Sequence, residues 1–503
     1  MSSPPYDLLV IGGGINGAGI ARDAAGRGLS VLLAEQDDLA AATSQWSTKL
    51  IHGGLRYLEY YEFRLVAESL AEREVLLANA PHLVEPLAFV LPHEPHLRPA
   101  WMIRIGLFLY DHLGRRRTLP KSFGVRLVDS RWAAGLKPRF RKGFVYADAR
   151  VDDARLVVVN ALDAQAHGAD IRVRTRVTGA RRDGGMWRVT LQTAGGATTE
   201  VTARAIVNAA GPWVKEVLDS VRPARAGEGN VRHVKGSHIV VPRVHAEEHA
   251  YILQNADNRI VFVIPYQEHY SLIGTTDIPV DAYEHPQISD DETEYLLALA
   301  NAYLDRPLAR ADVVWTYSGV RPLYDDGSSD PSAITRDYVL KVDALPGEPG
   351  PDRAPVLSLF GGKITTYRKL AEHALSELAP FFGGLKPAWT QTVPLPGGDL
   401  PGRDRNVWFA ELCRRYPQLP APLLRALANR HGTRALRILG DARTAEDLGE
   451  HFGAQLTARE IGYLLAEEWA QTADDVLWRR TKCGLPMTPE QRSAVAAHIA
   501  SRR

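Results

Sequence analysis

The segment Tyr6–Gln36 reads YDLLVIGGGINGAGIARDAAGRGLSVLLAEQ and decides the fold. Residues 6–14 begin as a short apolar run and end in three glycines, a pattern typical of a buried strand that leads into a tight turn. Residues 15–28 have helical spacing, and residues 29–36 contain a second apolar run. Together they predict a complete βαβ unit at the start of the chain.

The glycines of this turn, Gly12, Gly14 and Gly17, form the pattern G-x-G-x-x-G, with Gly19 close behind. Alone the pattern is a weak signal, and its rival is a purely structural turn. Here it follows a strand and opens a helix, which is the context that makes it specific for a dinucleotide. The helix N-terminus offers N–H groups to a pyrophosphate, and Glu35 after the second strand suits ribose hydroxyls rather than a 2′-phosphate.

Strands and helices continue to alternate along the chain. Residues 170–193 predict a hairpin with a Gly-Gly turn, and residues 259–277 predict an antiparallel pair of strands. Two further segments, 202–218 and 356–378, read as strand, glycine turn and helix. The predicted class is α/β, with a Rossmann-type domain beside a more antiparallel region.

The C-terminal part has a different character. After LPGGDLPGRDRN, residues 395–406, the pattern is helical with little strand signal, and residues 457–480 are the clearest amphipathic segment. We therefore expect a domain boundary near Pro396 to Arg403 and an all-helical domain over residues 396–503.

The bulk composition excludes several classes of protein. A chain of 503 residues is too long for one core, and its net charge of +1 gives no general attraction to nucleic acid. The two cysteines, Cys413 and Cys483, have no paired-ligand spacing, so we expect no metal site. The N-terminus shows no signal peptide, and no apolar run reaches the ~18 residues of a spanning helix.

The glycine pattern serves both NAD and FAD, and two later turns favour FAD. They lie at Ala210–Gly211 and Gly361–Gly362, each between a strand and a helix. A long flavin needs several backbone segments along it, and a helix N-terminus at the third turn stabilises the negative charge of reduced flavin. The rival interpretation is that both turns are ordinary α/β connections.

The chain resembles the aerobic FAD-dependent glycerol-3-phosphate dehydrogenases over essentially its whole length. The resemblance lies in residues 7–35, 47–74, 208–214, 235–243, 273–277, 317–323 and 360–375. It implies non-covalent FAD, oxidation of sn-glycerol 3-phosphate to dihydroxyacetone phosphate, and transfer of electrons to membrane quinone. It also implies a homodimer, cytoplasmic and peripheral on the inner face of the cell membrane.

The same resemblance implies an architecture of the glycine-oxidase and D-amino-acid-oxidase kind with a helical C-terminal domain. We expect a discontinuous FAD-binding domain at 1–80, 145–225 and 355–390. The mixed-sheet substrate domain is expected at 81–144 and 226–354.

The stretch LIHGGLRYLE, residues 50–59, is the first candidate for substrate binding. Gly53 and Gly54 let the chain approach the flavin, and Arg56 then projects toward the substrate phosphate with Tyr57 beside it. The rival role for Arg56 is a surface ion pair with Glu59 or Glu62, the usual fate of an arginine. The resemblance favours phosphate binding.

Arg321 in YSGVRPL is the second phosphate candidate, and its rival role is an ion pair with Asp325 or Asp326. His238 in KGSHIVVP matches the proposed proton acceptor of the family, although a strand-end histidine is often bonded to backbone. Lys363 is expected at the substrate oxygen or the reduced flavin, against the alternative of a solvated lysine at a helix start.

Other residues are expected around the same site. Lys235, Thr275 and Thr276 are expected to line the same cavity, and Lys235 and Thr275 are assigned to the substrate. The residues assigned to the cofactor are Gly12, Gly14, Asn16, Gly17, Glu35, Thr43, Ser44, Ser47, Lys49, His52, Gly53, Gly54, Ala210, Gly211, Gly361, Gly362, Lys363 and Thr365. One departure from the family is visible, because Gln45 and Trp46 stand where small serines are usual.

Residues 98–121 combine an apolar run, Trp101–Leu109, with the basic cluster Arg115, Arg116 and Arg117. This combination fits an interfacial membrane anchor, and it fits a buried helix followed by a solvated loop equally well. Two other functions stay open from the residues. One is a flavin oxidase of an amino acid or hydroxy acid that uses oxygen, and the other is a non-catalytic flavin sensor.

Overall fold

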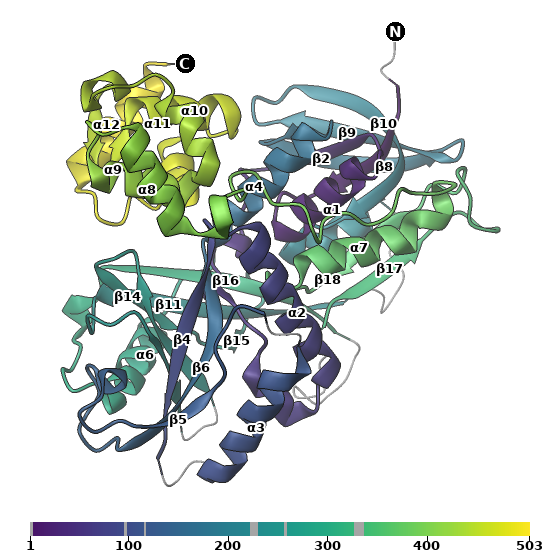
Figure 1. Cartoon of the computed structure of the whole chain (residues 1–503). Coiled ribbons are helices and arrows are strands. Elements are labelled where there is room, and N and C mark those ends of the chain that lie inside the picture. Colours follow the sequence, from purple (N-terminus) through teal and green to yellow (C-terminus); the bar gives the residue numbers. More distant parts are fainter. Residues whose placement is uncertain are drawn as a thin grey trace.

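The computed structural model describes residues 4–94, 98–114, 117–221, 230–255, 259–325 and 337–502. These residues form two sheets and a helical C-terminal domain (Figure 1). Within them, no helix is long and apolar enough to cross a membrane. No cluster of His, Cys, Asp or Glu in this described part is arranged to hold a metal ion.

The first sheet is built around the predicted βαβ unit and has eight strands in the described part of the chain. Its parallel centre runs in the order β18-β10-β1-β2-β7, with β17 antiparallel at one edge. Strands β8 and β9 form an antiparallel extension on β10. The strands are β1 Tyr6–Ile11, β2 Val31–Ala34, β7 Asp170–Arg172, β8 Thr175–Asp183, β9 Met186–Thr193, β10 Thr198–Asn208, β17 Val339–Asp343 and β18 Val356–Phe360.

The predicted hairpin is confirmed for residues 175–193, where Gly184 and Gly185 form the turn between β8 and β9. Residues 170–172 behave differently. They form the separate strand β7, which pairs in parallel with β2. Arg174, with a φ of 49°, interrupts the chain before β8 begins.

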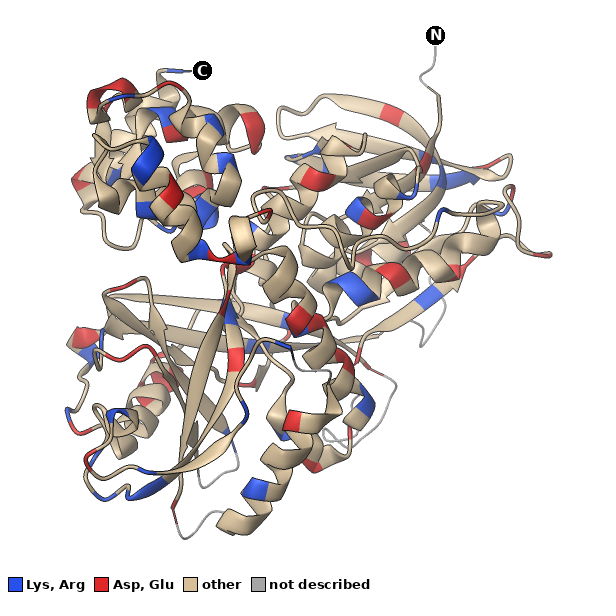
Figure 2. Cartoon of the chain, viewed as in Figure 1, with Lys and Arg blue, Asp and Glu red and all other residues tan. Residues whose placement is uncertain are grey.

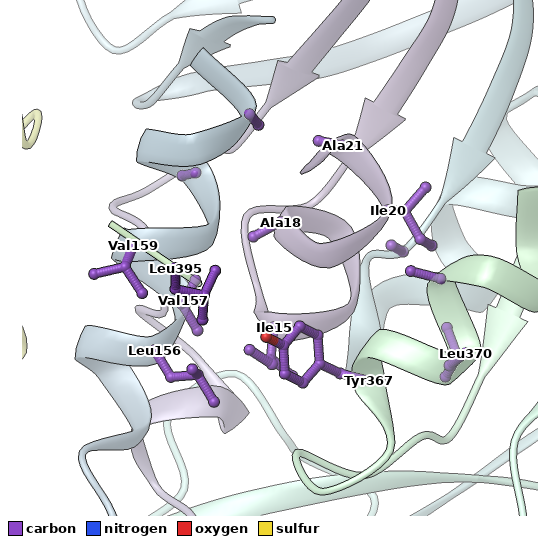
Figure 3. Close-up of a cluster of buried hydrophobic side chains, with 14 of the residues drawn as sticks. Ile15, Ala18, Ile20, Ala21, Leu156, Val157, Val159, Tyr367, Leu370 and Leu395 are labelled. Carbon is purple, nitrogen blue, oxygen red and sulfur yellow. The ribbon is translucent and has the colours of Figure 1, made fainter. Parts of the chain in front are cut away.

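Helices α1 (Ile15–Gly26), α4 (Asp153–Ala166) and α7 (Tyr367–Leu378) pack together against the first sheet. Figure 3 shows Ile15 and Ala18 of α1 between Val157 of α4 and Tyr367 of α7. A Cβ at Gly19 would lie 2.7 Å from the ring of Tyr367, so this glycine permits the close approach of α1 and α7. The helix that opens at the glycine turn is thereby fixed on both sides.

The second sheet is mixed, as predicted, because β4 and β12 pair in parallel and the other ladders are antiparallel. Helix α6 (Asp290–Tyr303) contacts strands of this sheet. Along the chain, α2 (Phe63–Asn79) precedes β4 and α3 (Ala100–Leu113) follows it. The strands are β3 Leu50–Ile51, β4 Val84–Pro92, β5 Phe123–Arg126, β6 Lys142–Val151, β11 Val231–Pro242, β12 Ala250–Gln254, β13 Ile260–Tyr266, β14 Tyr270–Gly274, β15 Ile278–Pro279 and β16 Trp315–Tyr324.

The C-terminal domain has its own buried core, separate from the cores of the two sheets. It is mainly helical, but the expectation of an all-helical domain is wrong at one place, a short hairpin of β19 (His451–Gly453) and β20 (Leu456–Thr457) that the sequence pattern did not reveal. Its helices are α8 Arg405–Arg415, α9 Ala421–His431, α10 Ala435–Leu439, α11 Ala458–Glu467 and α12 Pro489–Ala500. A π-helix, Asp475–Arg480 (η10), lies between α11 and α12.

The strand pairing suggests a revision of the domain limits. Strand β6, residues 142–151, pairs with β4 in the second sheet, whereas β17, residues 339–343, pairs with β18 in the first. We therefore propose limits after residue 151 and before residue 339, in place of 144/145 and 354/355.

Candidate active site

A cavity of about 990 Å³ lies where the two sheets meet. The first sheet contributes the carboxyl ends of β1 and β2 and the residues that directly follow β10 and β18, and the second contributes strands that include β11 and β16. In open α/β sheets, ligands bind beyond the carboxyl ends of the strands. The volume is at the upper end of the range for cofactor and substrate sites.

The glycine turn forms one wall of this cavity. Gly12 has a φ of +109°, a conformation that favours glycine, and Gly14 and Asn16 also border the cavity. Gly17 lies behind the wall, where an added Cβ would collide with the carbonyl oxygen of Gly12. The role of Gly17 is thus to permit the turn rather than to line the site.

Glu35 follows β2 and faces the same cavity. Its Oε2 accepts a hydrogen bond from the Gly13 N–H at 2.6 Å, and its Oε1 accepts one from Asp37 N–H at 2.8 Å. Burial raises the pKa of Glu35 to about 7, although the two N–H groups act in the opposite direction. A carboxyl group anchored in this way is held ready for the hydroxyl donors of a ribose.

The loop from Gln36 to Lys49 continues the wall, and Thr43, Ser44 and Ser47 all line the cavity as predicted. Ser44 accepts a hydrogen bond from the Ile15 N–H at 3.0 Å, which ties the loop to the start of α1. Lys49 was assigned to the cofactor, but its Nζ turns away from the cavity and bonds to Asp153 at 2.8 Å. A buried ammonium needs such a partner, which accounts for this orientation.

The two glycines of LIHGGLRYLE behave differently. Gly54, with a φ of +73°, borders the cavity, whereas Gly53 packs against Leu70 and Tyr110. The Gly53 N–H donates to the Tyr110 hydroxyl at 2.8 Å. The close approach at Gly53 is therefore to neighbouring side chains, and the prediction that it borders the flavin is wrong.

Three polar residues beside these glycines face the cavity, namely His52, Arg56 and Tyr57. Burial lowers the pKa of His52, so the imidazole stays neutral. Glu59, one of the two rival partners of Arg56, instead pairs with Arg98 at 3.1 Å. Among the described residues, no ion pair occupies the Arg56 guanidinium.

His238 lies on β11 with its side chain in the cavity wall and only 2% of its surface exposed. Its ring stacks on Tyr317 with centroids 4.7 Å apart, and Nε2 lies 3.1 Å from Oγ1 of Thr48. Within the described chain, Nδ1 has no hydrogen-bond partner. Burial, with the charges of Lys49 and Arg321, holds the pKa of His238 well below 6.5.

Arg321 on β16 reaches the same cavity, and its side chain is 46% exposed. It donates to Asp277 Oδ1 at 2.8 Å. Asp325, one of its two rival partners, instead lies 3.7 Å from Arg232, and Asp326 is outside the described residues. The carboxylate of Asp277 is thus the described partner of this partly exposed guanidinium.

Lys363 follows Gly361–Gly362, and all three residues line the cavity together with Thr365. Its Nζ is buried, has no hydrogen-bond partner among the described residues, and lies 3.9 Å from the centroid of the Tyr57 ring. Helix α7 begins only at Tyr367. Lys363 is therefore not a solvated lysine at a helix start.

Lys235 was assigned to the substrate, and the structure places it outside the cavity. Successive side chains of a strand point to opposite faces. On β11, Val234, Gly236 and His238 line the cavity, whereas Lys235 bonds to the Gln287 carbonyl and to Glu292, each at 2.8 Å. Thr275 and Thr276 do border the cavity, as do Ala210 and Gly211.

These features fit FAD. The glycine cradle presents the N-terminus of α1 to a pyrophosphate, and Glu35 suits a ribose. Farther along, buried polar atoms without partners in the described chain, namely Asn16 Oδ1, His238 Nδ1 and Lys363 Nζ, belong to cavity residues. Unpaired buried polar groups are costly, and polar groups of a ligand in the cavity would offset that cost.

Sequence reasoning missed several residues of the site. Thr48 bonds to His238, Tyr317 stacks on it, and Asp277 pairs with Arg321. Tyr317 and Asp277 both lie inside the motifs that carry the resemblance, so the motifs contained the signal but not the partners. Trp46, the departure from the family, lines the cavity and stacks on Tyr317 with centroids 5.4 Å apart.

Comparisons with known proteins agree with this geometry. Residues 7–342 match the family model described as FAD dependent oxidoreductase. Residues 388–501 match the model for the C-terminal domain of alpha-glycerophosphate oxidase.

Individual relatives match over almost the whole chain. The aerobic glycerol-3-phosphate dehydrogenase of Escherichia coli (strain K12) is 54% identical, covering 97% of this chain and 96% of its own. The D-erythritol 1-phosphate dehydrogenase of Brucella abortus (strain 2308) is 49% identical, covering 97% and 96%. The structure of glycerol-3-phosphate dehydrogenase from Bacillus halodurans, complexed with FAD, superimposes with a TM-score of 0.75 at 26% identity, covering 100% and 95%. The chain therefore belongs to the family of FAD-dependent glycerol-3-phosphate dehydrogenases.

Proposed function

We propose that this chain oxidises sn-glycerol 3-phosphate to dihydroxyacetone phosphate and passes the electrons to membrane quinone. The single observation that carries the proposal is one cavity in which the glycine turn meets Arg56, Arg321, His238 and Lys363. The names of the relatives support the same substrate class, a short polyol phosphate.

FAD, when bound, supplies the hydride acceptor. The chain must then bind the phosphate, orient the secondary hydroxyl and take its proton. His238 is suited to take the proton, because its lowered pKa keeps the imidazole neutral and Nδ1 is without a partner among the described residues. Thr48, bonded at Nε2, fixes the orientation of the ring.

Arg56 and Arg321 are proposed to hold the phosphate. Guanidinium groups form paired hydrogen bonds with phosphate oxygens, and two of them select a dianion over uncharged glycerol. Among the described residues, Asp277 accepts a hydrogen bond from Arg321 and would compete with a phosphate for its donors. Lys363 is proposed to bond the substrate oxygen, since its Nζ is buried against Tyr57 with no described hydrogen-bond partner.

Product analysis tests the substrate. The purified holoenzyme is given sn-glycerol 3-phosphate, D-erythritol 1-phosphate, glycerol or glycine with a soluble quinone analogue. We expect the highest kcat/KM with glycerol 3-phosphate, and dihydroxyacetone phosphate as the product. A higher kcat/KM with D-erythritol 1-phosphate would reassign the substrate, and turnover of glycine with oxygen would support the amino-acid oxidase instead.

The transfer of electrons to a lipid quinone requires contact with a membrane, and we propose that α3 provides it. The exposure of this segment supports the anchor, because Trp101 is 63% exposed and Met102, Ile105, Phe108 and Leu109 are exposed as well. Leu107 and Tyr110 are buried on the opposite side. Figure 2 shows almost no charge along α3, and of the basic cluster only Arg117 lies within the described residues.

An exposed apolar stripe on a helix is typical of an interfacial anchor. Tyr61 and Phe63, which precede or begin α2, are also exposed and extend the apolar character of this region. The location on the inner face of the cell membrane and the homodimer stay proposals that follow from the family.

A further inference from the structure

The C-terminal domain contacts the loop that carries the cofactor residues, through a short segment with an unusual conformation. This segment, Asp475–Lys482, comprises the π-helix η10 and the two residues after it. Single-turn π-helices often occur at functional sites. In the described chain, no residue of Asp475–Lys482 borders the cavity.

The contact centres on Asp38, which lies in the loop between Glu35 and Thr43 and is only 1% exposed. Arg480 donates from Nη1 and Nη2 to the two carboxylate oxygens of Asp38 at 2.7 and 2.8 Å. Arg479 donates from Nε to the same carboxylate at 2.5 Å. A paired arginine–carboxylate contact of this kind is both strong and specific in geometry.

A second contact supports the base of the same loop. Arg174 donates to Asp475 at 2.7 Å, and the Arg174 N–H bonds to the Asp37 carbonyl at 2.7 Å. Although burial alone would raise it, the positive charges of Arg479 and Arg174 lower the pKa of Asp475 to about 2. Asp475 therefore stays ionised at neutral pH and keeps both arginines in place.

A third contact lies at the other end of the loop. Ser47 and Lys49 bond to Asp153 at 2.7 and 2.8 Å, and Lys482 Nζ lies 3.9 Å from the same side chain. Trp478 stacks on Trp315 with ring centroids 4.8 Å apart. The ring centroid of Trp315 lies 6.0 Å from that of Trp46, which belongs to the loop. The segment thus touches the loop at Asp38 and the supports of the loop at Asp153 and Trp315.

We propose that Asp475–Lys482 is a clamp that holds the loop Gln36–Lys49 in the conformation that binds FAD. Arg480 is a positioning residue in this account, acting on the cofactor through Asp38. The clamp concerns retention of FAD rather than choice of substrate. If the glycerol-3-phosphate assignment failed, the clamp would still stand. If the clamp failed, the glycerol-3-phosphate assignment would be untouched.

The test compares two buried arginines of the C-terminal domain. Arg480→Met removes the contact with Asp38. Arg430→Met removes an ion pair with Glu460 at 3.0 Å that lies wholly inside the domain, and both arginines also bond to backbone carbonyls. The dissociation constant of FAD is measured by diluting each holoenzyme and recording the fluorescence of released flavin, well below its melting temperature.

Both variants are expected to lower the melting temperature. Only Arg480→Met should weaken FAD binding, by about tenfold, a typical size for coupling between sites. Arg480→Lys keeps the charge without the paired contact and should recover part of the loss. Equal effects of Arg480→Met and Arg430→Met on FAD binding, or no effect of either, would overturn the clamp.

A measurement on the wild-type chain covers the case in which Arg480→Met does not fold. Coupling is reciprocal, so binding of FAD must also stabilise the segment. Hydrogen exchange of the full chain is compared with and without saturating FAD. We expect slower exchange in residues 475–482 but not in α12 of the same domain. Unchanged exchange in 475–482, or equal slowing in α12, would contradict the proposal.

Discussion

At the scale of single residues, His238 has the surroundings that a proton acceptor needs. It is buried, stacked on Tyr317 and bonded to Thr48, and no carboxylate among the described residues bonds to its ring. Because no described carboxylate supplies a proton to this buried, neutral imidazole, the proton that it accepts must come from a donor beside it in the cavity. In this cavity we expect that donor to be the substrate hydroxyl.

His238→Ala should lower kcat by about 10²- to 10⁴-fold, the usual contribution of a general base, with a much smaller change in KM. The control is His249→Ala. His249 is also buried, but it stacks on His245 away from the cavity, so turnover should stay near normal. Near-normal turnover of His238→Ala would transfer the role to another group, Lys363 first.

The pH profile gives an independent check on the same residue. The pKa of His238 is lowered from 6.5 by burial and by two nearby cations. As the pH falls through this lowered value, the imidazole gains a proton and can no longer accept one. The acid limb of kcat/KM should therefore lie below pH 6.5, and a His238-dependent limb above 6.5 would contradict this environment.

Arg56 and Arg321 give the second prediction at this scale. A hydrogen bond to a charged group contributes about 1.5–3 kcal/mol, so each Arg→Ala variant should lose roughly tenfold to over a hundredfold in kcat/KM. Arg56→Lys should recover only part, because lysine lacks the paired donors. Asp277→Asn is the matched control, since it removes the carboxylate that competes for Arg321 and should lower KM.

The comparison of substrates decides the meaning of these variants. If phosphate recognition is lost, the preference for glycerol 3-phosphate over glycerol collapses in Arg56→Ala. If both substrates weaken equally, Arg56 supports the fold or the flavin, and the phosphate role is wrong.

Residue identities were predictable from the motifs, whereas side-chain directions were not. The short motifs placed His238, Arg321 and Lys363 correctly in the cavity wall, but Lys49 and Lys235 turn to carboxylates elsewhere in the fold. The alternation of β11 was available from the sequence and, once His238 was assigned to the site, placed Lys235 on the other face. The partners Thr48 and Asp277 depend on contacts between distant strands and loops, which one sequence does not reveal.

At the scale of elements, the glycine turn is the part that the sequence predicted best. Gly14 has an ordinary backbone conformation, and a Cβ there would meet only Ser44 Oγ, at 3.1 Å. Gly14→Val should therefore fold but place a branched side chain at the pyrophosphate position, which gives a colourless protein. Flavin content per chain, measured beside a circular dichroism spectrum, checks this. Full flavin occupancy in folded Gly14→Val would show that the cofactor binds elsewhere.

Helix α3 is the element whose role the sequence left open, because apolar periodicity is the same for a core helix and a surface anchor. The double variant Trp101→Glu and Phe108→Glu should lower binding to vesicles of mixed zwitterionic and anionic lipid by at least about tenfold. In this variant, charges replace apolar side chains that the lipid interface would bury. Val407 of α8 is 51% exposed, so Val407→Glu is a control and should bind normally. Cosedimentation measures the wild type and both variants, and equal binding by all three proteins would exclude α3 as the anchor.

At the scale of the whole molecule, two sheets meet at one cavity, and the C-terminal domain packs behind the loop Gln36–Lys49 that forms part of its wall. Periodicity and turn residues predicted the α/β class and the helical end, whereas the mixed second sheet was implied by the family resemblance. It could not assign β6 and β17 to their sheets, since strand pairing joins residues far apart in the chain. The ion pairs between Asp38 and the C-terminal arginines belong to the same category.

The central claim is that this cavity couples FAD to a phosphorylated polyol. The most direct measurement is the visible spectrum of the purified holoenzyme under anaerobic conditions. The account predicts that the flavin absorption bleaches with sn-glycerol 3-phosphate, and that glycerol and amino acids leave it unchanged. Bleaching by an amino acid, by glycerol as readily as by its phosphate, or by none of them would contradict the account.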